Sequence, residues 1–142
     1  MENKIEEIFD HIGKILSQNC PDNSLSTLLL VQIGDEFARI NIFDDLGDNI
    51  IYRWPGNSNI DTINLGDLIF ELQRVHNTSP PWCELDYFLQ GDHFKAYFRY
   101  ADEVDPERDT SNIRRDLLRP YFGERPVDYP PMPSVDGYDF SL

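Results

Sequence analysis

The sequence predicts an α+β domain in which helices pack on one antiparallel sheet of about five strands. Long segments repeat apolar residues at helical spacing, and shorter segments alternate apolar with polar residues as strands do. Short turn signals join consecutive strands, which favours antiparallel pairing between neighbours. Amphipathic helices can then cover the apolar face of the sheet. The expected order of elements is α-β-β-β-α-β-β-α.

Three helices are predicted. The first covers residues 3–18, where one face carries Ile5, Ile8, Phe9, Ile12, Ile15 and Leu16. It ends before Pro21, because the residue that precedes a proline resists helical geometry. The second covers roughly residues 63–77, around a stripe of Leu65, Leu68, Ile69, Leu72 and Val75, and a short third helix covers residues 111–119.

The strands are predicted from alternation between turn signals. Residues 25–33 and 36–43 form a hairpin around the Gly34-Asp35 turn. A turn from Asp44 to Asp48 then leads into a third strand, which has Ile50, Tyr52 and Trp54 on one face. Residues 83–89 and 93–100 form the second hairpin around Gln90-Gly91-Asp92.

Length and composition indicate one globular domain. The chain has 142 residues, of which 40% are hydrophobic and 27% charged, and a chain of this size can bury a core without a disulfide or a metal. We expect the domain to cover residues 1–122. Residues 123–142 are expected to form an acidic, proline-rich C-terminal tail with Pro126, Pro130, Pro131 and Pro133.

A cytoplasmic location is expected. The N-terminal segment lacks the basic start and the unbroken apolar stretch of a signal peptide. The longest apolar run, Leu28 to Val31, is far shorter than the roughly 20 residues that span a bilayer. Cys20 and Cys83 have no metal-ligand spacing, so both are expected to be reduced packing residues.

Motifs for catalysis are missing from the sequence. It has no glycine-rich phosphate loop, no G-x-S-x-G and no H-E-x-x-H. Cys83 and His93 could meet across the second hairpin, but no third group is suggested that would orient the histidine. We therefore expect a protein that is not an enzyme and needs neither a cofactor nor a metal.

The charge of the chain favours a basic protein partner. Its 26 acidic and 12 basic residues give a formal charge of −14, which repels nucleic acids and anionic membranes and attracts basic proteins. The alternative is that the charge serves solubility alone. Acidic turns and nearby aromatic residues are the predicted partner-binding residues: Asp44, Asp45, Asp48, Tyr52, Trp54, Tyr97, Asp102, Glu103, Asp105, Glu107 and Asp109.

The second hairpin resembles a known family. Pro81-Trp82, the strand ELDYFLQ, Gly91-Asp92 and the strand HFKAYFRY followed by Ala101-Asp102 are similar to the YezG-like family of bacterial immunity proteins. The resemblance covers about residues 3–122 and is most pronounced over residues 80–102. The chain departs from the family at the third helix, where RRDLLRPYFGERP replaces an aromatic, basic ending.

The resemblance implies a protein that protects a bacterium against a toxin delivered by sibling cells, as in contact-dependent growth inhibition and polymorphic toxin systems. Such a protein binds the toxin's C-terminal domain, often a nuclease, one-to-one and blocks its active site or substrate surface. It has no direct contact with nucleic acid or membrane. A second interpretation remains open. In element order, charge and size the chain also resembles type III secretion chaperones, which form homodimers that hold an extended segment of an effector.

Overall fold

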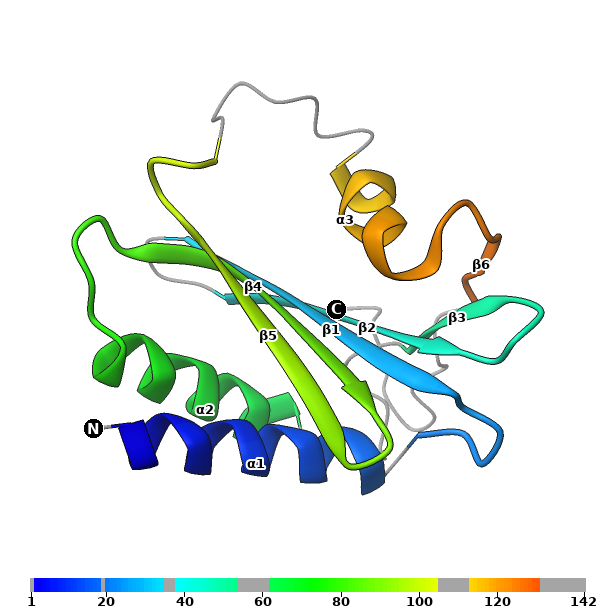
Figure 1. The fold of residues 1–142 in the computed structure, drawn as a ribbon, viewed down its shortest axis with the longest axis horizontal. Coiled ribbons are helices and arrows are strands. Elements are labelled where there is room, and N and C mark those ends of the chain that lie inside the picture. Colours follow the sequence, from blue (N-terminus) through cyan, green and yellow to red (C-terminus); the bar gives the residue numbers. More distant parts are fainter. Residues whose placement is uncertain (1, 19, 35–37, 54–61, 105–112, 131–142) are drawn as a thin grey trace, which may run out of the picture.

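The computed structural model describes residues 2–18, 20–34, 38–53, 62–104 and 113–130, and these form a three-layer α+β fold (Figure 1). Helices α1 (Glu2–Gln18) and α2 (Thr62–Val75) lie side by side on one face of a sheet, and α3 (Ile113–Phe122) lies on the other. The predicted fold class and element order are confirmed.

The sheet has six strands among the described residues. They are β1 (Ser26–Ile33), β2 (Ala38–Asp45), β3 (Ile50–Arg53), β4 (Trp82–Gln90), β5 (His93–Tyr100) and β6 (Val127–Asp128). Their order in space is β5-β4-β1-β2-β3-β6, so β1 lies near the middle and pairs antiparallel with both β2 and β4. The pairing of β3 with β6 is parallel, which makes the sheet mixed.

The apolar stripes of α1 and α2 form the larger core with one face of the sheet. This cluster contains 14 buried side chains: Ile8, Phe9, Ile12, Leu16, Leu29, Val31, Ile42, Leu65, Ile69, Leu72, Trp82, Leu85, Tyr87 and Leu89. Residues three and four apart on a helix share one face, so the predicted stripes of both helices point toward the strands. Trp82 is only 2% exposed and packs edge-on against Phe98, with 5.0 Å between ring centroids.

The apolar run in β1 is explained by burial on both faces. Leu29 and Val31 belong to the core under α1 and α2, whereas Leu28 and Leu30 belong to a second cluster under α3. Successive side chains of a strand point to opposite faces, so a central strand covered on both sides needs a continuous apolar sequence. The second cluster has seven buried residues: Leu28, Leu30, Phe43, Ile50, Tyr52, Leu118 and Phe122.

The predicted boundary at residue 122 is wrong, because the chain that follows α3 remains part of the fold. Gly123, with a φ of 66°, ends the helix in the left-handed region that glycine tolerates best. Arg125 then forms an ion pair with Asp45, and Val127 pairs with Ile50 in the sheet. The domain therefore extends at least to Pro130. The rest of the predicted tail, residues 131–142, lies outside the described residues.

The third helix ends later than predicted. It covers Ile113–Phe122 and includes Pro120, whereas the sequence indicated residues 111–119, of which 111 and 112 lie outside the described residues. None of the helices in the described ranges is long and apolar enough to cross a membrane.

Candidate functional site

Asp44 was predicted to contact a partner, but its carboxylate is buried in an internal ion pair. The residue is 1% exposed. Arg53 donates to both of its carboxylate oxygens, and the Thr27 hydroxyl donates to Oδ1 at 2.7 Å. The same arginine donates to the carbonyl of Leu16 at 3.1 Å, near the end of α1. Asp44 is therefore corrected from a surface contact to a structural residue that links two strands with a helix end.

Asp45 is also structural. Two nitrogens of Arg125 lie 2.8 and 2.9 Å from its two carboxylate oxygens, and the amide of Gly47 donates to Oδ1 at 2.8 Å. Burial alone would raise the pKa of Asp45, but the Arg125 guanidinium and the Gly47 amide outweigh it and hold this pKa below its ordinary value. Asp45 was predicted to bind a partner; its carboxylate is engaged with Arg125 and Gly47 inside the fold, and a partner contact through it stays a prediction.

Tyr52 is buried rather than exposed as an anchor. It is 5% exposed, and its hydroxyl donates to Asn41 Oδ1 at 3.0 Å. Its ring packs edge-on against Phe43, with 5.2 Å between centroids. Four further predicted partner residues lie outside the described residues, namely Trp54, Asp105, Glu107 and Asp109.

The remaining predicted residues are exposed but do not form one patch. They are Asp48, Tyr97, Asp102 and Glu103. Asp48 follows the end of β2 that pairs with the start of β1, and that end lies beside the Gln90 end of β4. Asp102 and Glu103 follow Tyr100, which pairs with Trp82 at the opposite end of β4. Any contact through these carboxylates therefore involves two separate ends of the sheet.

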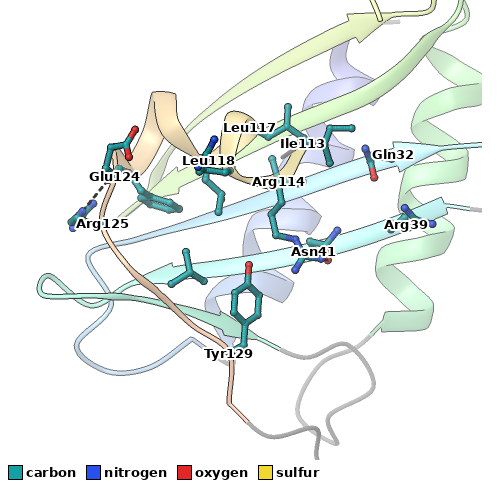
Figure 2. A pocket seen from close by; sticks show the side chains of 15 residues that line it. Gln32, Arg39, Asn41, Ile113, Arg114, Leu117, Leu118, Glu124, Arg125 and Tyr129 are labelled. Atoms are coloured by element: carbon teal, nitrogen blue, oxygen red, sulfur yellow. Dashed lines mark hydrogen bonds between the residues drawn. The ribbon is translucent and has the colours of Figure 1, made fainter. Parts of the chain in front are cut away.

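A cavity of about 660 Å³ lies between α3 and the sheet, and sequence reasoning did not predict it (Figure 2). Its apolar lining includes Leu30 from β1, Leu118 from α3 and Val127 from β6. Among the described residues, its polar lining contains four arginines, Arg39, Arg114, Arg115 and Arg125, and a single carboxylate from Glu124. In a chain with a charge of −14, this concentration of guanidinium groups is unexpected.

Arg114 occupies the middle of the cavity. It projects from α3 toward Asn41 on β2, and Tyr129 approaches from the opposite side (Figure 2). Its guanidinium carbon lies 5.4 Å from the ring centroids of Tyr52 and Tyr129 and 5.9 Å from that of Phe43. One nitrogen donates to Asn41 Oδ1 at 3.2 Å. Three aromatic rings and an amide therefore fix the position of this cation.

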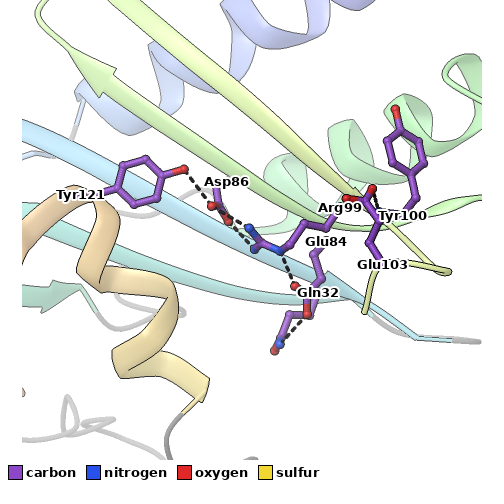
Figure 3. Close-up of polar contacts among 7 residues, drawn as sticks. All are labelled: Gln32, Glu84, Asp86, Arg99, Tyr100, Glu103 and Tyr121. Carbon is purple, nitrogen blue, oxygen red and sulfur yellow. Dashed lines mark hydrogen bonds and ion pairs between the residues drawn. The ribbon is translucent and has the colours of Figure 1, made fainter. Parts of the chain in front are cut away.

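A polar network lies on the same face of the sheet, under the other end of α3 (Figure 3). Arg99 on β5 donates to Glu84 at 2.6 Å and, through two nitrogens, to Asp86 at 2.6 and 2.9 Å. Both carboxylates are at most 3% exposed. The Tyr121 hydroxyl of α3 donates to Asp86 at 2.8 Å, and Gln32 donates to Glu84 at 3.2 Å. The network attaches α3 to the second hairpin.

This network is suited to holding charge rather than to transferring protons. Burial would lower the pKa of Arg99, but its bonds to Asp86 and Glu84 more than compensate and raise it above the ordinary value. Burial and the bond to Asp86 raise the pKa of Tyr121. At neutral pH the arginine is therefore charged and the phenol protonated, and both are engaged in fixed hydrogen bonds.

The Cys83–His93 arrangement does not form. Cys83 lies beside Trp82 at the start of β4, whereas His93 pairs with Gln90 at the turn of the hairpin. The two residues are thus at opposite ends of β4 and β5. Within the described ranges, no group of three or more histidine, cysteine, aspartate or glutamate residues could hold a metal ion.

No protein-family model matches this chain, and no curated protein is significantly similar to it in sequence.

Proposed function

We propose that this chain is an immunity protein that acts in the bacterial cytoplasm. It binds a cognate toxin domain one-to-one and blocks that domain's active site or substrate surface. The expected toxin domain is basic, as a nuclease is, because binding phosphates requires lysine and arginine. The proposed role involves no catalysis, no cofactor, and no direct contact with nucleic acid or membrane.

The observation that supports this proposal is the charge that remains after the internal ion pairs are removed. Asp44, Asp45, Glu84 and Asp86 are paired inside the fold with Arg53, Arg125 and Arg99. Subtracting these four carboxylates from 26 and these three guanidiniums from 12 leaves 22 acidic and nine basic residues, a charge of −13. The internal pairs therefore leave the negative charge of the rest of the chain almost unchanged.

Exposed carboxylates occur on more than one side of the described surface. Glu6 and Glu7 are exposed on α1, Asp102 and Glu103 are exposed beyond the end of β5, and Tyr97 within β5 is 54% exposed. Carboxylates spread in this way attract a basic partner over a distance and accelerate the encounter. An exposed tyrosine among them is a suitable anchor for the final contact.

The direct test is to mix the purified protein with the toxin domain encoded upstream of its gene. We expect a one-to-one complex by size-exclusion chromatography with light scattering, and loss of toxicity on mixing. Association should slow as salt increases, because ions screen exposed charges. A homodimer that binds only an extended effector segment would instead support the chaperone interpretation. Absence of any complex with the toxin domain would overturn the proposal.

Two charge reversals of equal size locate the binding face. Asp102→Lys/Glu103→Lys and Glu6→Lys/Glu7→Lys each change the net charge by the same amount, the first beyond the end of β5 and the second on α1. If the partner docks near Tyr97, the first pair should slow association about tenfold at low salt and the second much less. Equal slowing would indicate attraction by the net charge alone, with no preference for the Tyr97 side. If neither pair slows association, charge does not guide binding.

A further inference from the structure

The cavity under α3 is lined by arginines that differ from the other arginines of the fold in their partners. Among the arginines of the described sheet and of the chain after α3, Arg53, Arg99 and Arg125 each form paired bonds with carboxylates. Arg114 and Arg115 differ, because neither forms an ion pair with a carboxylate of the described residues. The chain has more than twice as many acidic as basic residues. Two arginines that face a cavity without such a partner among the described residues are therefore an exception that needs a reason.

Their position in α3 strengthens this argument. Arg114 and Arg115 lie in the first turn of the helix, where the partial positive charge of the helix dipole makes cations unfavourable and anions favourable. The Arg114 guanidinium is also held in place by three aromatic rings and Asn41, so little entropy would be lost on binding. Of the described residues in the cavity lining, only Glu124 has a carboxylate, and it lies 3.1 Å from Arg119 and is engaged there.

The size and lining of the cavity restrict the ligand. Its volume of about 660 Å³ lies within the usual range for small-molecule sites, roughly 300 to 1,000 Å³. Leu30, Leu118 and Val127 provide apolar surface that an inorganic ion would leave unused. A polyanion such as nucleic acid would be repelled by the negative charge of the surrounding protein.

We propose that this cavity binds a small organic anion. Arg114 and Arg115 hold its carboxylate or phosphate group, and its flat apolar body lies against Leu30, Leu118 and the ring of Tyr129. Guanidinium groups bind both kinds of oxyanion through paired hydrogen bonds, so the site chemistry is shared between the two ligand classes. The proposal does not depend on toxin binding, because it concerns a different set of residues and charges.

The test uses the full-length protein and two matched pairs of probes in calorimetric titrations. One pair is 1-naphthoate and neutral 1-naphthamide, and the other is adenosine 5′-monophosphate and neutral adenosine. We expect the anionic member of at least one pair to bind at least about tenfold more tightly than its neutral partner, because a charge-assisted hydrogen bond is lost in the latter. The probe pair in which the anion binds more tightly than its neutral partner identifies the ligand as a carboxylate or a phosphate.

Variants then locate the site. Arg115→Gln should weaken binding of the anionic probe about tenfold without affecting folding, because Arg115 is exposed. Arg114→Gln should weaken it at least as much, with circular dichroism to check the fold around its aromatic contacts. Arg74→Gln is the control, because Arg74 is an exposed arginine on α2, on the opposite face.

Three results would overturn the proposal. They are equal binding of charged and neutral probes, no binding of either anion at millimolar concentration, and equal effects of the Arg115 and Arg74 variants. Inorganic phosphate that binds as tightly as the organic anions would also contradict it, because the apolar lining would then have no role.

Discussion

On one face of the sheet, α1 and α2 bury 14 apolar side chains, whereas on the other face α3 buries seven beside a cavity and the Arg99 network. Most contacts under α1 and α2 are apolar, and an apolar contact has no directional requirement. The α3 face adds hydrogen bonds that involve charged groups, such as Tyr121 to Asp86 and Arg114 to Asn41, each with one correct geometry. The stability of the first face therefore depends mainly on how its apolar volume is filled, and that of the second depends in addition on polar partners.

The largest expected effect is on the α3 face. Replacing Arg99 by methionine would leave the buried carboxylates of Glu84 and Asp86 without their cation, and should reduce the free energy of unfolding by about 3–5 kcal/mol at pH 7. Urea denaturation measures this loss. Arg119→Met is the control, since Arg119 is exposed and should cost no more than about 0.5 kcal/mol. Similar losses for both variants would mean that burial of the network contributes little.

Two glycine substitutions test how closely side chains are packed on the face of the sheet that α1 and α2 cover. A β-carbon at Gly13 of α1 would lie 2.8 Å from the Tyr87 hydroxyl, which donates to the carbonyl of Phe9. Gly13→Ala should therefore destabilise the fold by about 1–3 kcal/mol, as measured by thermal and urea denaturation. Gly66 of α2 has no atom within 4 Å of the corresponding position, so Gly66→Ala should stabilise by about 0.5–1 kcal/mol.

A double variant checks the cause of the Gly13 effect. Tyr87→Phe removes the hydroxyl that the new methyl group would meet, so it should recover part of the loss in the Gly13→Ala background. If the double variant is as unstable as the two single losses combined, the steric explanation fails.

The hydrogen bond from Tyr121 of α3 to Asp86 of β4 is expected to contribute less to the free energy of unfolding. Tyr121→Phe removes the hydrogen bond to Asp86 and should cost about 1.5–2 kcal/mol. Because the folded state raises the pKa of Tyr121, its contribution is complete below the ordinary phenol pKa of about 10 and is lost as pH rises beyond it. The variant should therefore lose less stability than the wild type in urea titrations above pH 10. Tyr97→Phe, at an exposed position, should follow the wild type.

The smallest expected effect on stability is that of replacing Asp45, and its size depends on pH. Its pKa is lowered in the folded state, so its contribution is present above the ordinary carboxyl pKa of about 4 and is lost as pH falls below it. Asp45→Asn should be less stable at pH 7, and its urea midpoint should fall less steeply from pH 5 to pH 3. Asp48→Asn, in the exposed turn, should parallel the wild type. If the urea midpoint of Asp45→Asn fell as steeply between pH 5 and pH 3 as that of the wild type, the ion pair of Asp45 would not contribute to the acid dependence of stability.

The sequence was sufficient for the elements whose signal is local. The helical stripes of α1 and α2 and the alternation in both hairpins repeat within a few residues, and each predicted element is present. The run Asp44-Asp45-Leu46-Gly47-Asp48 predicts a turn that includes Asp44 and Asp45. They lie in β2 because Arg53 and Arg125 pair with them, and Arg125 is 80 residues away from Asp45. Local patterns contain no information on such partners.

The cavity could not be predicted for the same reason. Its lining combines residues of β1, β2, α3 and the chain after Gly123, which meet only through the packing of α3. One signal was available in the sequence. Arg114 and Arg115 stand together near the start of a predicted helix, where basic residues are disfavoured. Strand β6 has only two residues, too few for any periodicity to reveal.

The parallel pairing of Val127 with Ile50 has a consequence for synthesis on the ribosome. All parts of the core under α1 and α2 have been translated by residue 100, but α3 and β6 follow later. During that interval the apolar side chains of Leu28, Leu30 and Phe43 have no cover, so the nascent chain presents them to chaperones or to other chains. A stop codon placed just before Ile113, the first residue of α3, would make this interval permanent.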